Sequence, residues 1–276
     1  MAQHSTPPMI ALGAGLRAAR EERGYRLRAL AGQLDLEPPA VSMIELGHRP
    51  PTAAYVARVL GFLAVDKAEY RRLMALVQNL ELSNWVDTSA YPDALIDYER
   101  NATTFLLWAP RLFPNLVRTP DYTREVLDTG LLTSDEIDQS LMLHLVRRDA
   151  ALARENPATV TILLGERTLH HKIEAPGVRQ AQLQYLLMLI EEGRITVRII
   201  PGGGPPTPTP DLPFTLMHFR ARNPVVSVCQ DHFHVYLTEP AAVTRHKNAA
   251  DRLLARALHP PASRALIASV LASAPG

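Results

Sequence analysis

Several histidines in the second half of the chain could supply metal ligands. His232 and His234 stand two residues apart, so on a β-strand their side chains would share one face. Asp211 and Asp231 could complete such a site. His170, His171 and His218 could also be ligands, but they form no second cluster with ligand spacing. Histidines on short strands are usually polar surface residues, so we expect no metal centre and no cofactor.

No residue pattern predicts a catalytic centre. Glu166 and Glu174 could work as paired carboxylates, but nothing in the sequence places them together. Ser227 lacks the Gly-x-Ser-x-Gly elbow, and the only cysteine, Cys229, lacks a nucleophile signature. Gly202 begins a glycine run after a strand-like segment, but no Gly-Lys-Ser/Thr follows it. We therefore expect a protein that is not an enzyme.

Residues 12–60 carry the strongest functional pattern, a series of short helices separated by turn signals. The apolar spacing predicts helices over residues 12–24, 27–34, 38–47, 53–62 and 68–80. A tight break at residues 35–37 separates the second helix from the third. A short helix, a short turn and a recognition helix with a narrow buried face make a helix-turn-helix.

The end of the third helix, Ser42-x-x-Glu45-x-Gly47 followed by Arg49, resembles the Xre (phage-repressor-like) helix-turn-helix family. This resemblance implies that the third helix enters the major groove of double-stranded DNA. Carried over by position, the residues that would face bases are Pro39, Ala40, Ser42 and Met43. Those that would lie near the phosphate backbone are Arg26, Arg28, His48 and Arg49.

The sequence departs from this family at the start of both helices. Arg26 and Leu27 stand where Ser or Thr and then Gln are usual, and the third helix begins Glu37-Pro-Pro-Ala. Few of these side chains can form the bidentate base contacts that provide discrimination. Modest intrinsic affinity follows, which a homodimer or a partner could compensate. Small helices with this spacing also occur in domains that bind only proteins, and that alternative stays open.

The composition is that of a two-domain globular protein. The chain has 276 residues, of which 47% are hydrophobic and 21% charged, and its formal net charge is +1. A DNA contact must therefore come from a local patch. We expect a helix-turn-helix domain at 1–80, a connector at 81–92 and a second domain at 93–276. Without a signal-peptide pattern or an apolar run near the roughly 20 residues of a membrane span, we expect a cytoplasmic protein that contacts no membrane.

The second domain is predicted to be α+β, with four or five short strands after a mainly α N-terminal domain. The strand candidates are residues 160–164, 195–200, 214–219, 225–229 and 234–237. The helix candidates are residues 134–155, 179–192, 241–258 and 263–271.

Several segments of this domain resemble, in order, the actinobacterial WhiJ-like, antitoxin-like regulators. They are residues 114–122, 145–152, 166–169, 182–183, 195–201 and 213–219. Asn115 and Arg118 replace the glycine and glutamine usual in the first segment. The resemblance implies a regulator that is often paired with a small neighbour-encoded protein. From this resemblance we also expect Glu166 and Arg167 to form a buried ion pair with a structural role.

Two segments have two interpretations each. The aromatic-rich residues 98–122 are the core joining the domains, or they line a small-molecule pocket. The Pro/Gly-rich residues 201–213 are a surface excursion, or a lid or partner-docking loop. We expect a sequence-specific regulator whose C-terminal domain senses a ligand or a protein, with an antitoxin-like interaction protein as the alternative. A signal acting on residues 91–124 would alter the spacing of two recognition helices in a homodimer.

Arg49→Ala should weaken binding of the protein to its own upstream DNA, because it removes a cation expected beside the phosphates. Fluorescence anisotropy across a salt series measures this, with a random duplex beside the upstream DNA. If the protein binds no duplex even at low salt, the protein by itself does not bind DNA. This result would favour the alternative of a domain that binds only proteins.

Overall fold

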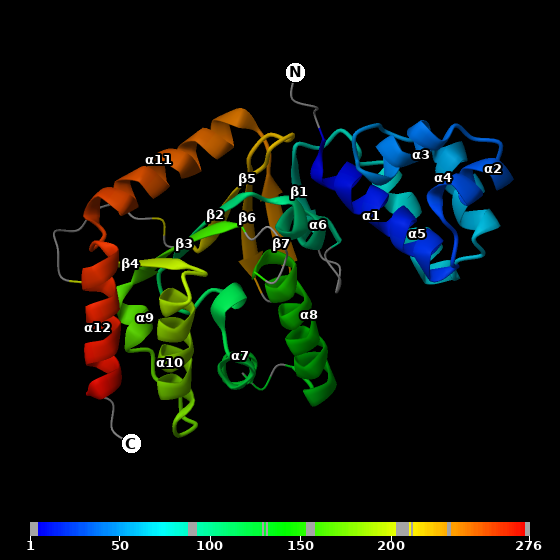
Figure 1. The fold of residues 1–276 in the computed structure, drawn as a ribbon. Coiled ribbons are helices and arrows are strands. Elements are labelled where there is room, and N and C mark those ends of the chain that lie inside the picture. The colour runs from blue at the N-terminus through cyan, green and yellow to red at the C-terminus, as the bar shows by residue number, and fades with distance from the viewer. Residues whose placement is uncertain are drawn as a thin grey trace.

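The computed structural model describes residues 5–87, 93–128, 130, 132–152, 158–202, 210, 212–230 and 233–273. Figure 1 shows a helical unit at the N-terminal end of the chain beside a larger part built around one β-sheet. In the described part of the chain, helices that could cross a membrane are absent.

The helical unit contains the five short helices predicted from the sequence. They are α1 (Pro7–Glu22), α2 (Leu27–Gln33), α3 (Pro38–Glu45), α4 (Ala53–Phe62) and α5 (Lys67–Val77). Their facing sides bury a common core, and its most deeply buried residues include Leu12, Leu30, Val56, Leu60 and Leu73. Because most of the stability of a short helix comes from such packing, none of these helices is expected to be stable alone.

The turn between α2 and α3 sets the angle between these two helices. Asp35 adopts a positive φ of 48° there, a conformation that aspartate tolerates better than most residues. The amide of Leu36 donates to the carbonyl oxygen of Ala31 over 2.8 Å and closes the turn. Ala31 is fully buried, as its small size at a close helix crossing predicts. Pro38 and Pro39 lie in the first turn of α3, where the missing amide protons cost little.

A buried ion pair joins α1 to the end of α3. Arg20 donates through Nε to Oε1 of Glu45 over 2.7 Å and through Nη2 to Oε2 over 2.8 Å. The residues are 7% and 5% exposed, so the charges are desolvated and must pair. Arg20 Nη1 also donates to the carbonyl oxygen of Tyr25, and this hydrogen bond holds the turn before α2 against α1. Glu45 of the family-like motif therefore has a structural role.

Two glycines allow α1 to approach α3 closely. A Cβ on Gly13 would lie 2.6 Å from the carbonyl oxygen of Ile44, a contact that the backbone could not accommodate. Gly47 has a φ of +67° and its missing Cβ would lie 2.7 Å from Cδ1 of Ile10. A glycine is therefore required at position 47 by both conformation and space.

The second part of the molecule is α+β, as predicted, and its sheet is mixed. The strands are β1 (Asn84–Asp87), β2 (Thr104–Ala109), β3 (Thr159–Gly165), β4 (Thr196–Ile200), β5 (Phe214–His218), β6 (Val225–Gln230) and β7 (Phe233–Leu237). Their spatial order is β1-β7-β6-β5-β2-β3-β4. Strands β2, β3 and β4 are parallel, and the other neighbouring pairs are antiparallel.

The described residues form a 7-stranded sheet rather than the four or five strands expected. The first additional strand, β1, lies within the predicted connector and pairs with β7, with Trp85 opposite Tyr236. The second, β2, lies within the aromatic-rich segment. Its Phe105 and Trp108 point to opposite faces of the sheet and are both buried, so the strand lacks the alternation of a half-exposed strand. Both strands find their partners far along the chain, which local patterns do not reveal.

Helices cover both faces of the sheet. On one face lies α11 (Pro240–Arg256), packed on residues such as Trp108, Leu163 and Leu216. The other helices are α6 (Asp93–Asn101), α7 (Pro120–Leu127), α8 (Ser134–Leu152), the single turn α9 (Glu166–Leu169), α10 (Val178–Glu191) and α12 (Pro260–Ala272). In Figure 1, α7, α8 and α10 lie on the side of the sheet opposite α11. The sequence analysis did not predict α6 and α7.

The helical unit packs on the sheet domain through α6. This helix lies against α1, and Ile10, Leu95 and Tyr98 belong to one continuous apolar core. Tyr98 also packs its ring against Phe219 and Tyr236, each with centroids 5.7 Å away. The interpretation of the aromatic residues as a joining core therefore holds for Tyr98, and α6 is the element that links the two domains.

Glu45→Ala should lower the free energy of unfolding by about 3–5 kcal/mol, because it leaves Arg20 buried without a counter-charge. Urea denaturation followed by circular dichroism measures this change. The matched control is Glu191→Ala, which breaks an exposed pair with Arg264 and should cost about 0–1 kcal/mol. Equal losses in the two variants would contradict a structural role for the buried pair.

Candidate functional site

The residues predicted to contact DNA lie on and around the outer face of α3. Arg26, Arg28, Pro39 and Arg49 are exposed, and Ala40, Ser42, Met43 and His48 are partly exposed. Val41, Ile44 and Glu45 form the buried side of the same helix. One face of α3 is thus committed to the core and the other is available to a partner. Contact of these eight residues with DNA stays a prediction.

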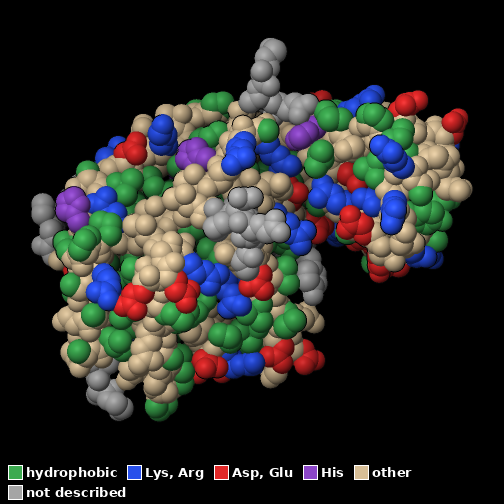
Figure 2. Space-filling view, in the orientation of Figure 1, with side chains coloured by type: hydrophobic (Ala, Val, Ile, Leu, Met, Phe, Trp, Pro, Cys, Tyr) green, Lys and Arg blue, Asp and Glu red, His purple; other side chains and the backbone are tan. Residues whose placement is uncertain are grey.

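The two helix starts at which the sequence departs from the Xre pattern lack side-chain caps. Arg26 and Glu37, the residues before α2 and α3, make no side-chain capping hydrogen bond. Thr52 and Asp66, before α4 and α5, do cap their helices. On the face of the helical unit seen in Figure 2, Lys and Arg side chains are interspersed with Asp and Glu. This face therefore carries charges of both signs and is not uniformly basic.

His48 lies where the helical unit meets the sheet domain. Its Nε2 atom is buried and finds no hydrogen-bond partner in the described part of the chain. Burial and then the charge of Arg222 lower its pKa. Arg222, in the turn between β5 and β6, donates to the carbonyl oxygen of Leu46 over 3.3 Å and to Oδ2 of Asp97 over 2.7 Å. A charged group of the sheet domain therefore contacts the C-terminal end of α3.

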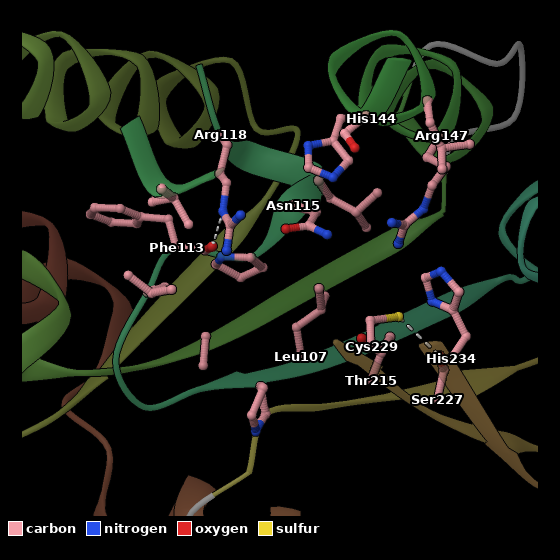
Figure 3. A pocket seen from close by; sticks show the side chains of 18 of the residues that line it. Leu107, Phe113, Asn115, Arg118, His144, Arg147, Thr215, Ser227, Cys229 and His234 are labelled. Carbon is pink, nitrogen blue, oxygen red and sulfur yellow. Dashed lines mark hydrogen bonds between the residues drawn. The ribbon is translucent and has the colours of Figure 1, made fainter. Parts of the chain in front are cut away.

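A cavity of about 710 Å³ opens on the face of the sheet that α8 covers. This volume lies within the range of small-molecule sites, about 300–1,000 Å³. Its floor is formed by inward-facing residues of neighbouring strands, with Leu107 opposite Thr215, Thr215 opposite Ser227, and Cys229 opposite His234. Figure 3 shows these side chains below those of α8 and of the segment that follows β2.

The segment after β2 forms one wall of the cavity and is held by Gln182 of α10. Gln182 is fully buried; its Nε2 donates to the carbonyl oxygen of Val117 over 2.7 Å, and its Oε1 accepts from the amide of Thr119 over 2.8 Å. Arg118 donates through Nε to the carbonyl oxygen of Phe113 over 2.6 Å. These bonds fix Phe113 and Arg118 in the lining, so the wall is preformed.

A second buried ion pair lies at the polar end of the cavity. Arg147 of α8 donates to Glu99 of α6 over 2.8 and 3.0 Å, and both side chains are at most 6% exposed. Burial raises the pKa of Glu99, and the charge of Arg147 opposes that shift. Cys229 lies nearby with its Sγ 3.4 Å from Oγ of Ser227, and burial raises the pKa of its thiol. A thiol of this kind reacts slowly at neutral pH, because little of it is thiolate.

Two histidines beside this pair carry unmatched ring nitrogens. Within the described residues, the Nδ1 atoms of His144 and His234 are buried and lack a hydrogen-bond partner. Burial and then the charge of Arg147 lower their pKa values, to about 3 for His144 and about 4 for His234. Both rings are therefore neutral near pH 7. In Figure 3 they lie on opposite sides of the cavity, one from α8 and one from the sheet.

The residues considered for metal binding and catalysis are not brought together where the structure describes them. Among the described residues, no three His, Cys, Asp or Glu side chains form a group that could hold a metal ion. Asp211, Asp231 and His232 lie outside the described residues, as does most of 201–213. The interpretation of Glu166 and Arg167 as a buried ion pair was wrong. Glu166 accepts a hydrogen bond from the amide of Gly202 over 2.6 Å, and Arg167 is exposed.

Comparison with known families accounts for most of the chain. Residues 92–269 match a family described as a domain of unknown function, DUF5753. The chain belongs to this DUF5753 family. Residues 11–73 match a helix-turn-helix domain, HTH_31, so the five N-terminal helices are a helix-turn-helix domain joined to a DUF5753 domain. This match supports DNA binding, whereas the Xre and WhiJ-like resemblances remain finer predictions.

Other comparisons add little to the family assignment. Curated proteins gave no match. One solved structure with some similarity is that of TrmBL2, described as an archaeal chromatin protein with a novel mode of DNA binding. The two chains are 13% identical, the match covers 75% of this chain and 67% of the other, and the TM-score is 0.32. A score this low carries no argument about the DUF5753 domain.

The sequence analysis missed the Glu99–Arg147 pair and Arg222. A signal for Arg147 was present, because Leu143 and Ala151 stand four residues to either side and place it on an apolar helix face. Glu99 follows the buried Tyr98 on a helix that was not predicted. Arg222 had no local signal, since its partners Asp97 and Leu46 are far away in the sequence.

His144→Leu should make the protein less sensitive to acid. In the unfolded chain an imidazole takes up a proton below its pKa of about 6.5, whereas the folded state keeps His144 neutral down to about pH 3. Acid therefore favours unfolding of the parent protein through this group, by about 1 kcal/mol at pH 5.5. Urea midpoints at pH 7.5 and 5.5 measure the difference. The exposed His171→Leu variant is the control and should follow the parent, and a His144→Leu curve parallel to the parent's would contradict the buried neutral state.

Proposed function

We propose that the protein is a cytoplasmic, sequence-specific transcriptional regulator, and not an enzyme. In this proposal its DUF5753 domain controls the helix-turn-helix in response to a ligand. The observation that carries the proposal is the position of α6. This helix contributes Glu99 to the cavity and Asp97 to the contact with the end of the recognition helix.

The contact at the recognition helix is specific and largely shielded from water. The side chains of Arg222 and Asp97 are 9% and 8% exposed, and Nη2 of Arg222 reaches the carbonyl oxygen of Leu46 directly after α3. A buried charged pair tolerates little displacement, because separating it leaves desolvated charges. The pair therefore suits an element with two discrete arrangements better than one that deforms gradually.

The cavity is connected to this contact over a short distance along one helix. Glu99 stands two residues after Asp97 on α6 and holds Arg147 in the cavity lining. A ligand that binds one arrangement of α6 more tightly than another shifts the equilibrium between them. A shift of α6 also acts on α1, which packs against it and carries Arg20, the partner of Glu45 in α3.

A homodimer would convert such a shift into a change of DNA affinity. Two recognition helices must lie about 34–36 Å apart to enter successive major grooves on one side of DNA. A change in the angle of each helix-turn-helix domain on its sheet domain alters that spacing. Because α3 offers few groups for bidentate base contacts, the spacing contributes a large share of the specificity.

The alternative is an antitoxin-like protein that binds a small neighbour-encoded protein and uses DNA for autoregulation. One observation favours it. On α8, Met142 and Val146 stand one helical turn apart and are 61% and 44% exposed, so they offer an apolar stripe to a partner. The stripe is small, and we rank this function second.

Arg222→Ala should weaken binding to the upstream DNA by about tenfold, within the usual range of coupling between sites. It should leave the dependence of binding on salt unchanged, because in this proposal Arg222 contacts no phosphate. Arg49→Ala should instead reduce the salt slope by about 1. Anisotropy titrations at several salt concentrations separate the two effects.

Arg220→Ala is the matched control, because Arg220 is an exposed arginine of the same turn. It should bind DNA as the parent does. If Arg222→Ala and Arg220→Ala have the same affinity, the contact at Leu46 does not control the recognition helix. A reduced salt slope in Arg222→Ala would mean that Arg222 itself touches DNA, and this result also contradicts the proposal.

A further inference from the structure

The polar end of the cavity offers hydrogen bonds that the described residues leave unused. The Nδ1 atoms of His144 and His234 are buried and unpartnered, although an unsatisfied buried polar atom is costly. Both residues line the same cavity, and His234 is paired across the strands with Cys229. A neutral imidazole nitrogen donates or accepts according to its tautomer. A hydroxyl or carbonyl group that comes within hydrogen-bond distance of either nitrogen would satisfy it.

The charges at this end disfavour an ionic group. A cation would meet Arg147 and Arg118, both of which line the cavity. An anion between the two histidines would find Nε and Nη2 of Arg147 already bound by Glu99, over 3.0 and 2.8 Å, and would face the buried carboxylate of Glu99 itself, while Arg118 lies at the other end of the cavity. Burying a charge without a new partner costs far more than burying an uncharged polar group that is hydrogen-bonded. The head of a ligand here must therefore be uncharged.

The rest of the cavity is largely apolar. Its apolar lining includes Leu107, Phe113, Leu116, Val126, Leu127 and Leu143. Such a lining favours the binding of a hydrocarbon group, because binding removes that group from water. The volume of about 710 Å³ accommodates an organic molecule of medium size.

We propose that the cavity binds an uncharged amphipathic organic molecule. Its hydroxyl or carbonyl head lies between His144 and His234 and its hydrocarbon body lies along the apolar lining. Only the expected effect of this ligand on DNA binding rests on the proposed function. The binding itself is independent of DNA, so each can fail without the other.

Cys229 provides a direct measure of occupancy. It is the only cysteine of the chain, it lines the cavity, and it is partly exposed there. A ligand in the cavity must slow its alkylation by iodoacetamide, which mass spectrometry of the intact protein follows. The probes are decan-1-ol, decanoate and decylammonium, which have ten carbons each and carry an uncharged, a negative and a positive head group.

Decan-1-ol should protect Cys229 at concentrations at least about tenfold lower than decanoate or decylammonium, because each ion would leave a buried charge uncompensated. Equal protection by the three probes, or stronger protection by either ion, would overturn the proposed ligand class. If no probe slows alkylation below its solubility limit, the cavity does not bind amphipathic molecules and the inference fails.

Substitution of the histidines tests the position of the head. His144→Leu and His234→Leu should each weaken protection by decan-1-ol by about tenfold, the effect of one buried hydrogen bond. His171→Leu, at an exposed position outside the cavity lining, is the control and should behave as the parent. Urea denaturation verifies that each variant is folded. Unchanged protection in both cavity variants would place the head elsewhere and contradict the proposal.

Discussion

The ion pair between Glu99 and Arg147 is the interaction on which the relation between the two domains depends. It fixes α6 against α8, and α6 is the helix on which α1 of the helix-turn-helix domain packs. Both side chains are almost completely buried, so neither charge can return to water without disrupting the packing around it. A buried ion pair adds little net stability compared with apolar residues of the same size, but it strongly disfavours other positions of its partners. In this protein the position that it fixes is that of α6.

The same pair determines the chemistry of the cavity. Burial, and then the positive charge of Arg147, keeps His144 and His234 neutral, and Glu99 occupies the Nε and Nη2 donors of Arg147. The polar end of the cavity thus combines two neutral imidazoles with an ion pair whose charges compensate each other. Gln182 holds the opposite wall in place through two backbone contacts, so the lining is formed before any ligand arrives. Preformed sites bind without the entropic cost of ordering their walls.

The helix-turn-helix domain has a tightly held interior. Its surface on α3 offers few side chains that could make specific base contacts. The Arg20–Glu45 pair and the close approach at Gly13 hold α1 and α3 as one body. That body meets the DUF5753 domain at α6 and at Arg222, next to the end of α3. If α3 enters a DNA groove as proposed, its proline, alanine and methionine gain little from base contacts, and control of its orientation then has a large effect on binding.

The sequence by itself determined the five N-terminal helices, the α+β class of the second domain and most of its later strands, because amphipathic periodicity and turn residues are local. It also determined the family-like motif around Glu45, although not that Glu45 would be buried against Arg20. Only the tertiary structure decided the places of β1 and β2, the cavity, and the partners of Arg147 and Arg222. Their partners lie far along the chain: Glu99 is 48 residues from Arg147 and Leu46 is 176 residues from Arg222. Pairing and desolvation at such separations depend on how the elements pack, and no local pattern of side chains encodes that packing.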